Sequence, residues 1–123
     1  MKLLLPAVVA LIVLASSCNW ENTYTYSVAN STDTVIAIHM KTLTRDTIVE
    51  MGSGKTETIY IAHQKSGIAG PDPIDISKHF SALYILKGAD RTPRDFLDKK
   101  EWQFEETGKR GATYSTTIKN QDF

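Results

Sequence analysis

The chain of 123 residues has one cysteine, Cys18, so it forms no disulfide bond within itself. It has no excess of charge of either sign, because 14 basic residues balance 14 acidic ones. This balance excludes the basic surface that nucleic-acid binding requires, and we expect no nucleic-acid partner. The longest apolar run, residues 3–14, is too short for a membrane-spanning helix, which needs about 20 residues.

The sequence also lacks the motifs of common catalytic and metal sites. His39, His63 and His79 are far apart and have no cysteine nearby, whereas small zinc sites use closely spaced ligands. Residues 52–56 (GSGKT) resemble the end of a phosphate-binding loop, but Val49 stands where that motif needs glycine, and a strand-like pattern follows. We therefore interpret 52–54 as a turn and predict no catalytic residue, no metal and no cofactor.

Carboxylates are frequent in the second half of the chain, where turns are also frequent. We interpret them as solvated charges and turn caps rather than as the paired acids of a glycosidase, which face each other across a cleft. They are Asp72, Asp75, Asp90, Asp95 and Asp98.

The first 17 residues have the three parts of a secretory signal peptide. Met1 and Lys2 form a short positive start, the apolar run 3–14 follows, and small residues occupy 15–17. We predict that residues 1–17 are removed and that the mature chain begins at Cys18.

Residues 14–18 (LASSC) resemble the bacterial lipobox, in which apolar and small residues precede a cysteine that becomes lipid-modified. The resemblance implies lipidation of Cys18, with residues 18–22 as a short tether. Each buried CH₂ contributes about 0.8 kcal/mol, so more than one acyl chain makes a stable anchor. The alternative is ordinary cleavage that leaves Cys18 as a free or intermolecular thiol. Trp20 is a candidate membrane-interface or ligand-contacting aromatic residue.

Residues 23–123 have the length of one domain, with polar turns between runs of alternating or β-branched residues. Two hairpins are predicted, one from the first two runs and one from the next two. The seven runs cover 23–29, 34–40, 46–51, 55–62, 82–87, 101–105 and 112–119.

Two segments differ from this pattern. Residues 66–80 hold two prolines and two glycines without a sustained period, which predicts a long loop. Thr92 and Pro93 form a helix-start signal that predicts a short helix ending near Lys100. The continuous apolar run 83–86 predicts a central strand covered on both faces. The sequence thus predicts an all-β fold, an immunoglobulin-like β-sandwich of about seven strands with one short helix. A small barrel is the structural alternative.

Aromatic residues on sandwich faces serve either as core or as sugar-stacking platforms. Trp102 and Phe104 are assigned to the core, and the other aromatic residues leave both interpretations open. The aromatic residues considered for sugar stacking, before Trp102 is assigned to the core, are Trp20, Tyr24, Tyr26, Tyr60, Tyr84, Trp102 and Tyr114.

The chain resembles the small lipoproteins of Bacteroidetes-type bacteria in its Ser-Ser-Cys18 junction, its Thr- and Ile-rich strand 33–38 and its final segment 114–123. The resemblance implies export and residence in the outer membrane, because Asn19, not aspartate, follows Cys18. It also implies candidate O-glycosylation at Thr34 and Thr47, which lie in Asp-Thr-aliphatic triplets.

Three functions follow as hypotheses. The first is a non-catalytic envelope lipoprotein, held by its N-terminal lipid, that contacts an envelope protein or has a structural role. The second is a surface-displayed glycan-binding module, which requires an exposed aromatic strip. The third is a small envelope enzyme, which requires a cleft that joins a histidine to a carboxylate.

Overall fold

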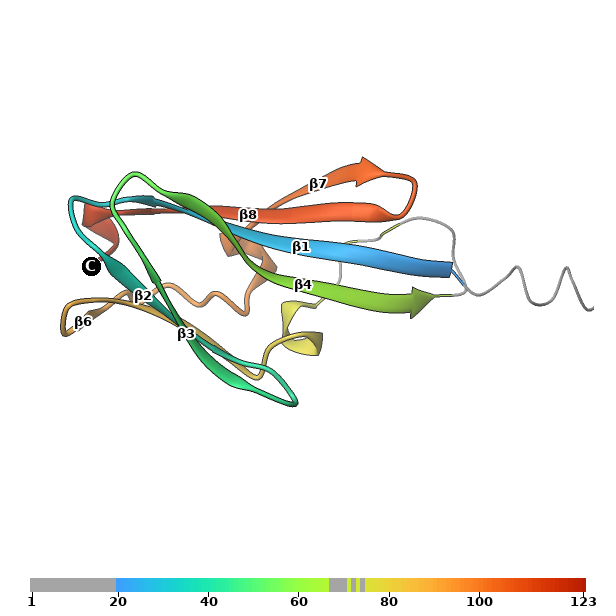
Figure 1. Ribbon diagram of the computed structural model, residues 1–123, viewed down its shortest axis with the longest axis horizontal. Helices are drawn as coiled ribbons and strands as arrows, with labels where there is room; N and C mark the ends of the chain where they lie inside the picture. The colour runs from blue at the N-terminus through green and yellow to red at the C-terminus, as the bar shows by residue number, and fades with distance from the viewer. Residues whose placement is uncertain (1–19, 67–70, 72, 74) are drawn as a thin grey trace, which may run out of the picture.

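The structure is a computed structural model that describes residues 20–66, 71, 73 and 75–123, which form two four-stranded β-sheets packed face to face (Figure 1). The predicted all-β sandwich is therefore confirmed. Helical structure in these residues is limited to three 3₁₀ turns, at Ile76–Lys78, Lys99–Glu101 and Asn120–Asp122. The leader 1–17 and Cys18 lie outside the described residues.

The first sheet, here the β1 sheet, has the strand order β4-β1-β8-β7. Its first and last strands in the sequence pair in parallel, β1 with β8, and its other pairs are antiparallel. The strands are β1 (Trp20–Ser31), β4 (Thr56–Ser66), β7 (Gln103–Gly108) and β8 (Gly111–Lys119).

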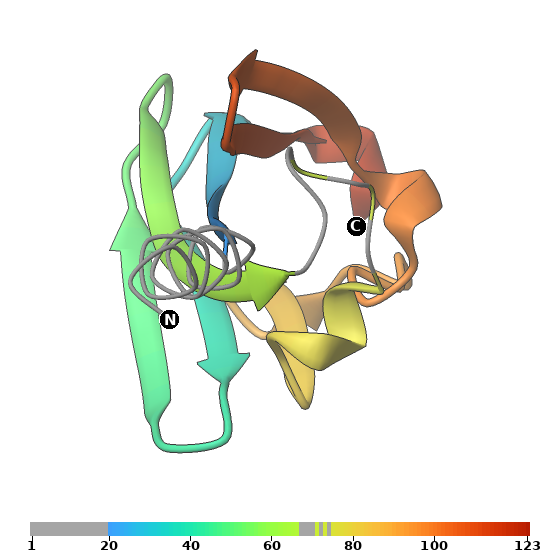
Figure 2. The ribbon, with the colours of Figure 1, turned by 90° about the vertical axis from the view of Figure 1, so that its right-hand side faces the viewer.

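The second sheet, here the β2 sheet, has the order β3-β2-β5-β6 and is wholly antiparallel. Its strands are β2 (Ile36–Lys41), β3 (Asp46–Met51), β5 (Ala82–Lys87) and β6 (Asp90–Arg91). Figure 2 shows the ribbon from its end, along the long axis of the molecule. Buried side chains from both sheets form one core cluster.

The two predicted hairpins are wrong. β1 and β2 belong to different sheets, and so do β3 and β4, so each connection is a corner between the two layers. The described hairpins are β2–β3, β5–β6 and β7–β8. A polar turn shows that the chain reverses, but the turn residues alone do not show whether the flanking strands pair or separate into two layers.

The two corners meet at Asn30, at the end of β1. Its side-chain amide nitrogen donates to the carbonyl oxygens of Thr34 and Met51, both at 2.9 Å. Its side-chain oxygen accepts from the backbone N–H and the hydroxyl of Thr32. Its backbone carbonyl accepts from Gly54, whose φ of 77° favours glycine. One buried side chain therefore holds both crossovers together.

The core follows the alternation of the strands. Tyr26 on β1 is fully buried, stacks on Tyr114 at a centroid distance of 5.1 Å, and meets the edges of Phe80 and Trp102. Burial of a large apolar side chain contributes about 1.5–3 kcal/mol. Trp102 is buried and Phe104 packs against the core, as predicted.

Two details of the burial differ from expectation. Ile59 and Ile61 are two positions apart on β4 and would share one face of a regular strand, but Ile59 is buried and Ile61 is half-exposed. The register with β1 shifts here by one residue, a bulge that reorients the strand. β5 is central in its sheet but buried on one face only, since Tyr84 and Leu86 point to the outer face and stay partly exposed.

The expected helix over 92–100 is replaced by successive turns that end in the 3₁₀ turn Lys99–Glu101. Three side chains accept hydrogen bonds from the backbone N–H two residues later: Thr92 from Arg94, Asp95 from Leu97, and Asp98 from Lys100. These local bonds compete with helix formation, and they confirm the prediction that Asp95 and Asp98 act as caps.

Candidate functional site

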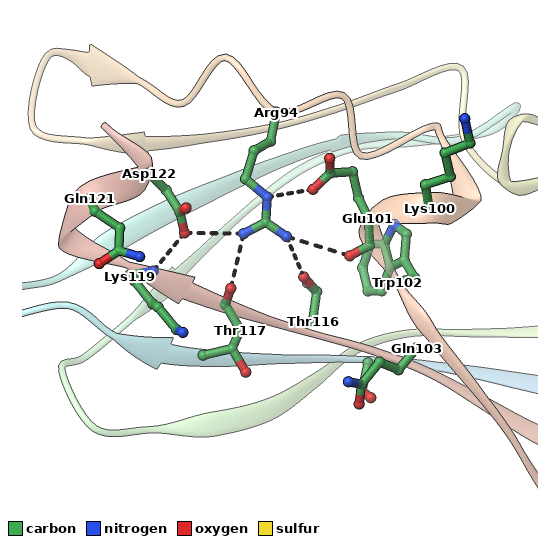
Figure 3. Close-up of a pocket in the computed structure, with 11 residues that line it drawn as sticks. Arg94, Lys100, Glu101, Trp102, Gln103, Thr116, Thr117, Lys119, Gln121 and Asp122 are labelled. Carbon is green, nitrogen blue, oxygen red and sulfur yellow. Dashed lines mark hydrogen bonds and ion pairs between the residues drawn. The ribbon is translucent and has the colours of Figure 1, made fainter.

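A cavity of about 470 Å³ lies between the 92–102 segment, β8 and the C-terminal 3₁₀ turn. Figure 3 shows Arg94 extending into it from the loop after β6, toward Thr116 and Thr117 of β8. The carboxylates of Glu101 and Asp122 lie on either side of its guanidinium. The cavity therefore holds one guanidinium between two carboxylates, and Lys100 and Lys119 add two further cations to its lining.

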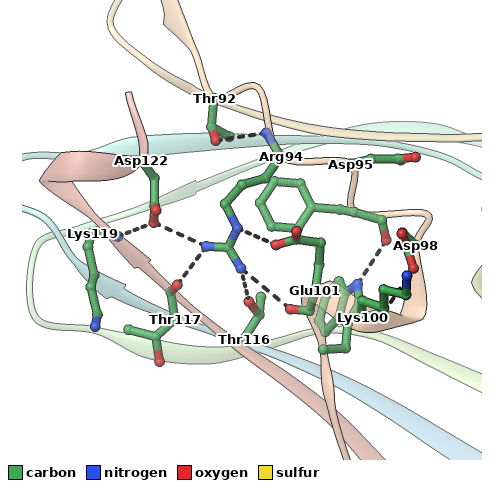
Figure 4. Close-up of polar contacts among 12 residues, drawn as sticks. Thr92, Arg94, Asp95, Asp98, Lys100, Glu101, Thr116, Thr117, Lys119 and Asp122 are labelled. Atoms are coloured by element: carbon green, nitrogen blue, oxygen red, sulfur yellow. Dashed lines mark hydrogen bonds and ion pairs between the residues drawn. The ribbon is translucent and has the colours of Figure 1, made fainter.

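Arg94 uses its whole set of N–H donors on protein acceptors (Figure 4). Nε donates to the carboxylate of Glu101, and one Nη2 bond, at 3.4 Å, reaches the carbonyl of the same residue. The second Nη2 bond goes to the hydroxyl of Thr116 at 2.8 Å. Nη1 donates to the carbonyl of Thr117 at 2.9 Å and to Asp122 at 3.1 Å.

A guanidinium has five N–H donors, and these five bonds occupy all of them. An anionic ligand would have to displace a protein acceptor to bind Arg94. The guanidinium also lies over the ring of Phe96 at 4.9 Å. The arrangement fits a structural cross-link that ties the 92–102 segment to β8 and to the C-terminal turn.

A second polar group lies on the core side of β1. The hydroxyl of Tyr26 hydrogen-bonds Nδ1 of His79, and Nε2 of His79 lies 3.3 Å from the side-chain oxygen of Gln64. A neutral imidazole satisfies both bonds when the hydroxyl donates to Nδ1 and Nε2–H donates to Gln64.

Burial sets the protonation of this pair. Burial, and secondarily the charge of Lys78, lowers the pKa of His79 below its ordinary value of 6.5. Burial, and then the neighbouring tyrosines, raises the pKa of Tyr26. Both groups are therefore neutral at pH 7, which suits a core hydrogen bond between Tyr26 and His79.

His63 lies at the surface. Nδ1 of His63 is 3.2 Å from the hydroxyl of Thr23 and 3.4 Å from the carboxylate of Glu21. Both His63 and Glu21 are more than half exposed. In residues 20–66, 71, 73 and 75–123, no three histidine, cysteine or acidic side chains are grouped as a metal site.

The outer face of the β2 sheet carries an aromatic row. His39 of β2 stacks on Tyr84 of β5 with centroids 4.7 Å apart and planes at 14°. The guanidinium of Arg91 lies 4.2 Å above the ring of Tyr84. On the other side of His39, its cross-strand neighbour Ile48 is 60% exposed. Ile48, His39 and Tyr84 thus form one cross-strand row, and Arg91, which pairs with Leu86 in the next row, reaches over Tyr84.

A shallow depression of about 350 Å³ adjoins this row. Its lining includes Ile48 and His39, together with the opposed charged pair Lys41 and Asp46. The depression therefore offers apolar, aromatic and charged groups side by side.

The aromatic candidates for sugar stacking divide sharply. Tyr24, Tyr26, Trp102 and Tyr114 are buried, so these residues belong to the core. Tyr60 is partly buried and packs on Phe80. Tyr84 lies on the outer face between the His39 ring and the Arg91 guanidinium.

The predicted modification sites differ in how accessible they are. Cys18 lies outside the described residues, and of Trp20 only the backbone is described, as the first residue of β1. Thr34 is exposed in the corner between β1 and β2. Thr47 is half-buried on β3, on the face that it shares with Val49 and Met51. O-glycosylation at either threonine stays a prediction, and Thr34 is the more accessible of the two.

The aromatic row was not predicted, although its residues alternate correctly along each strand. His39 and Tyr84 are 45 positions apart in the sequence, and only the pairing of β2 with β5 brings them together. The detectable signal was limited to a polar aromatic residue between buried aliphatic residues in each strand.

The structure and the comparisons with known proteins add two findings. The described residues contain no helix with the length and apolar character that crossing a bilayer requires. Comparison of the chain with protein-family models, curated proteins and solved structures finds no match.

Proposed function

We propose that this chain is a non-catalytic lipoprotein of the bacterial cell envelope, which binds an envelope protein through the outer face of its β2 sheet. The observation that carries the proposal is the outer-face row Ile48–His39–Tyr84, with the Arg91 guanidinium over the Tyr84 ring. Tyrosine and arginine are enriched among the residues that dominate protein–protein binding energy. Two of the four side chains hold each other in place by stacking, so little entropy is lost when a partner covers them.

The short separation in sequence between Cys18 and β1 is compatible with the proposed anchor. β1 begins at Trp20, two residues after Cys18. Two extended residues span about 7 Å, so a lipid on Cys18 would hold the sandwich close to the bilayer. The proposed location is the outer membrane, on the sequence resemblance given above.

A glycan-binding module is the second candidate. The depression beside Ile48 and His39 favours it, because Lys41 and Asp46 offer hydrogen-bonding groups to a sugar. Against it, sugar stacking needs a free aromatic face, and Tyr84 is flanked by His39 and Arg91. A glycan array probed with the purified mature protein tests this candidate, and a specific hit that is lost in Tyr84→Ala would favour it over protein binding.

The proposed function is tested by photo-crosslinking in intact cells. A photoreactive amino acid replaces Ile48 on the β2 sheet or, as a matched control, Glu105, an exposed residue of β7. We expect protein adducts from position 48 and few or none from position 105. Equal or absent crosslinking at both positions would contradict binding through the β2 sheet.

A further inference from the structure

One row of the β2 sheet has an ordered charge pattern across all four strands. Cross-strand pairing places Glu50 beside Ala37, Ala37 beside Leu86, and Leu86 beside Arg91. All four side chains point to the outer face, away from the buried Met51, Ile36 and Ile85. The row thus has an acid on edge strand β3, a base on edge strand β6, and two small or aliphatic side chains between them.

This pattern is complementary to itself. When two such faces pack around a two-fold axis that runs parallel to the strands, between β2 and β5, β3 of one copy lies over β6 of the other. Glu50 then faces Arg91 of the second copy, and the same pair forms again at the opposite edge. Ala37 faces Leu86, so the small side chain leaves room for the larger one.

The neighbouring row supports the same arrangement. His39 and Tyr84 occupy the two central strands. The axis therefore places His39 of one copy over Tyr84 of the other, and the reverse, which adds aromatic contact area. Ile48, which is 60% exposed, lies in the same row on edge strand β3. In the third row, Lys41 faces Ala82, while Asp46 lies beyond the end of the two-residue strand β6.

A different symmetry is disfavoured by the same charges. An axis perpendicular to the strands would place β3 over β3, so that Asp46 and Glu50 of one copy approach the two carboxylates of the other. Like charges brought together at an interface oppose association. The charge pattern therefore selects the parallel axis.

We propose that the partner of the outer β2-sheet face is a second copy of this chain, in a two-fold dimer with reciprocal Glu50–Arg91 ion pairs. The proposal rests on the proposed function, because it names the occupant of the same face. Three strands of the face have six residues and the fourth, β6, has two, so the face spans at most roughly 19 by 20 Å. This is below the about 800 Å² per partner of a stable interface, so the dimer is weak in dilute solution. Tethering both copies to one membrane raises their effective concentration.

The test uses the full chain in its native membrane, in two versions with different epitope tags and with the photoreactive residue at position 48. We expect an adduct that carries both tags. Glu50→Arg in both copies places two arginines opposite each other at each edge, and Arg91→Glu in both copies does the same with two glutamates. Each should lower the yield of dimer adduct by about tenfold.

Pairing one copy of each variant gives the decisive result. Glu50→Arg in one copy and Arg91→Glu in the other restores an opposite-charge pair at both edges, so the yield should return to within about twofold of wild type. Both residues are exposed, and an unchanged melting temperature shows that each variant folds. Glu105→Arg on the other sheet changes the charge by the same amount and should leave the yield unchanged.

Three results would overturn the proposal. They are single variants that crosslink as well as wild type, a mixed pair that fails to recover, and an adduct from position 48 that contains only a different protein. The third result refutes the second copy but leaves the proposed function intact, whereas the absence of any adduct refutes both.

Discussion

The side-chain amide nitrogen of Asn30 lies 2.9 Å from the carbonyl oxygen of Met51, which is 21 residues farther along the chain. Asn30 is the last residue but one of β1 at one corner of the sandwich, and Met51 ends β3 at the other. Because each corner moves the chain from one sheet to the other, this side chain fixes where both sheets separate. The fold therefore depends on one amide at the junction of its two layers.

We predict that Asn30→Ala lowers the free energy of unfolding by about 2–4 kcal/mol, because it leaves buried carbonyl and N–H groups without partners. Chemical denaturation measures the change. Ser53→Ala removes a single hydrogen bond, to the Thr32 carbonyl at the same corner, and should cost about 1 kcal/mol. An Asn30→Ala variant no less stable than Ser53→Ala would contradict this role.

A second prediction about stability concerns the ion pairs of Arg94. Arg94→Gln removes the cation that joins the Glu101 and Asp122 carboxylates, each less than one-third exposed. We expect a loss of about 2–3 kcal/mol in the free energy of unfolding, below the cost for a fully buried pair because solvent screens part of the interaction.

The matched control for Arg94 is Arg91→Gln. Arg91 is exposed and its described contact is with the Tyr84 ring, so its loss should cost less than about 1 kcal/mol. Urea denaturation of the two variants compares them directly. Similar losses in both would show that the network around Arg94 has no special structural weight.

We predict that the buried His79 makes the stability of the fold depend on pH. Its pKa is lowered in the folded protein, chiefly by burial, so the unfolded chain takes up the proton first as the pH falls. The free energy of unfolding should therefore decrease as the pH drops below 6.5 toward the folded-state pKa. Urea denaturation at pH 7.5 and pH 5.5 measures the difference.

Two variants assign this pH dependence to His79. His79→Asn should remove much of the difference between the two pH values. Lys78→Gln should reduce it by a smaller amount, because the charge of Lys78 is the secondary cause of the lowered pKa. If the dependence persists unchanged in His79→Asn, another group is responsible.

The sequence predicted the local structure well, because alternation is a property of each strand by itself. The run 112–119 was predicted as a strand, and its alternate residues Tyr114, Thr116 and Ile118 are all buried on one face. The pairing of strands depends on contacts between distant segments. The corner residues 30–34 contain the polar side chains of a hairpin turn, and only the bonds of Asn30 to Met51 show that the chain changes sheet there.

The candidate binding face could not be predicted from the sequence, because it also depends on the pairing of distant strands. Its charge pattern combines Glu50 from β3 with Arg91 from β6, which share a row only because β2 and β5 lie between them. The helix predicted at Thr92 failed because each capping side chain bonds locally. Capping side chains recur at every third residue, at Thr92, Asp95 and Asp98, and they favour three short turns over one helix.

The claim that the chain is a membrane-anchored lipoprotein is tested most directly by the mass of its N-terminal peptide, after purification from the membranes of its native host. We expect a peptide that begins at Cys18 and carries a diacylglyceryl group on sulfur, and we expect Cys18→Ala to abolish the modification. An unmodified thiol at the N-terminus, or a peptide that still contains residues 1–17, would contradict it.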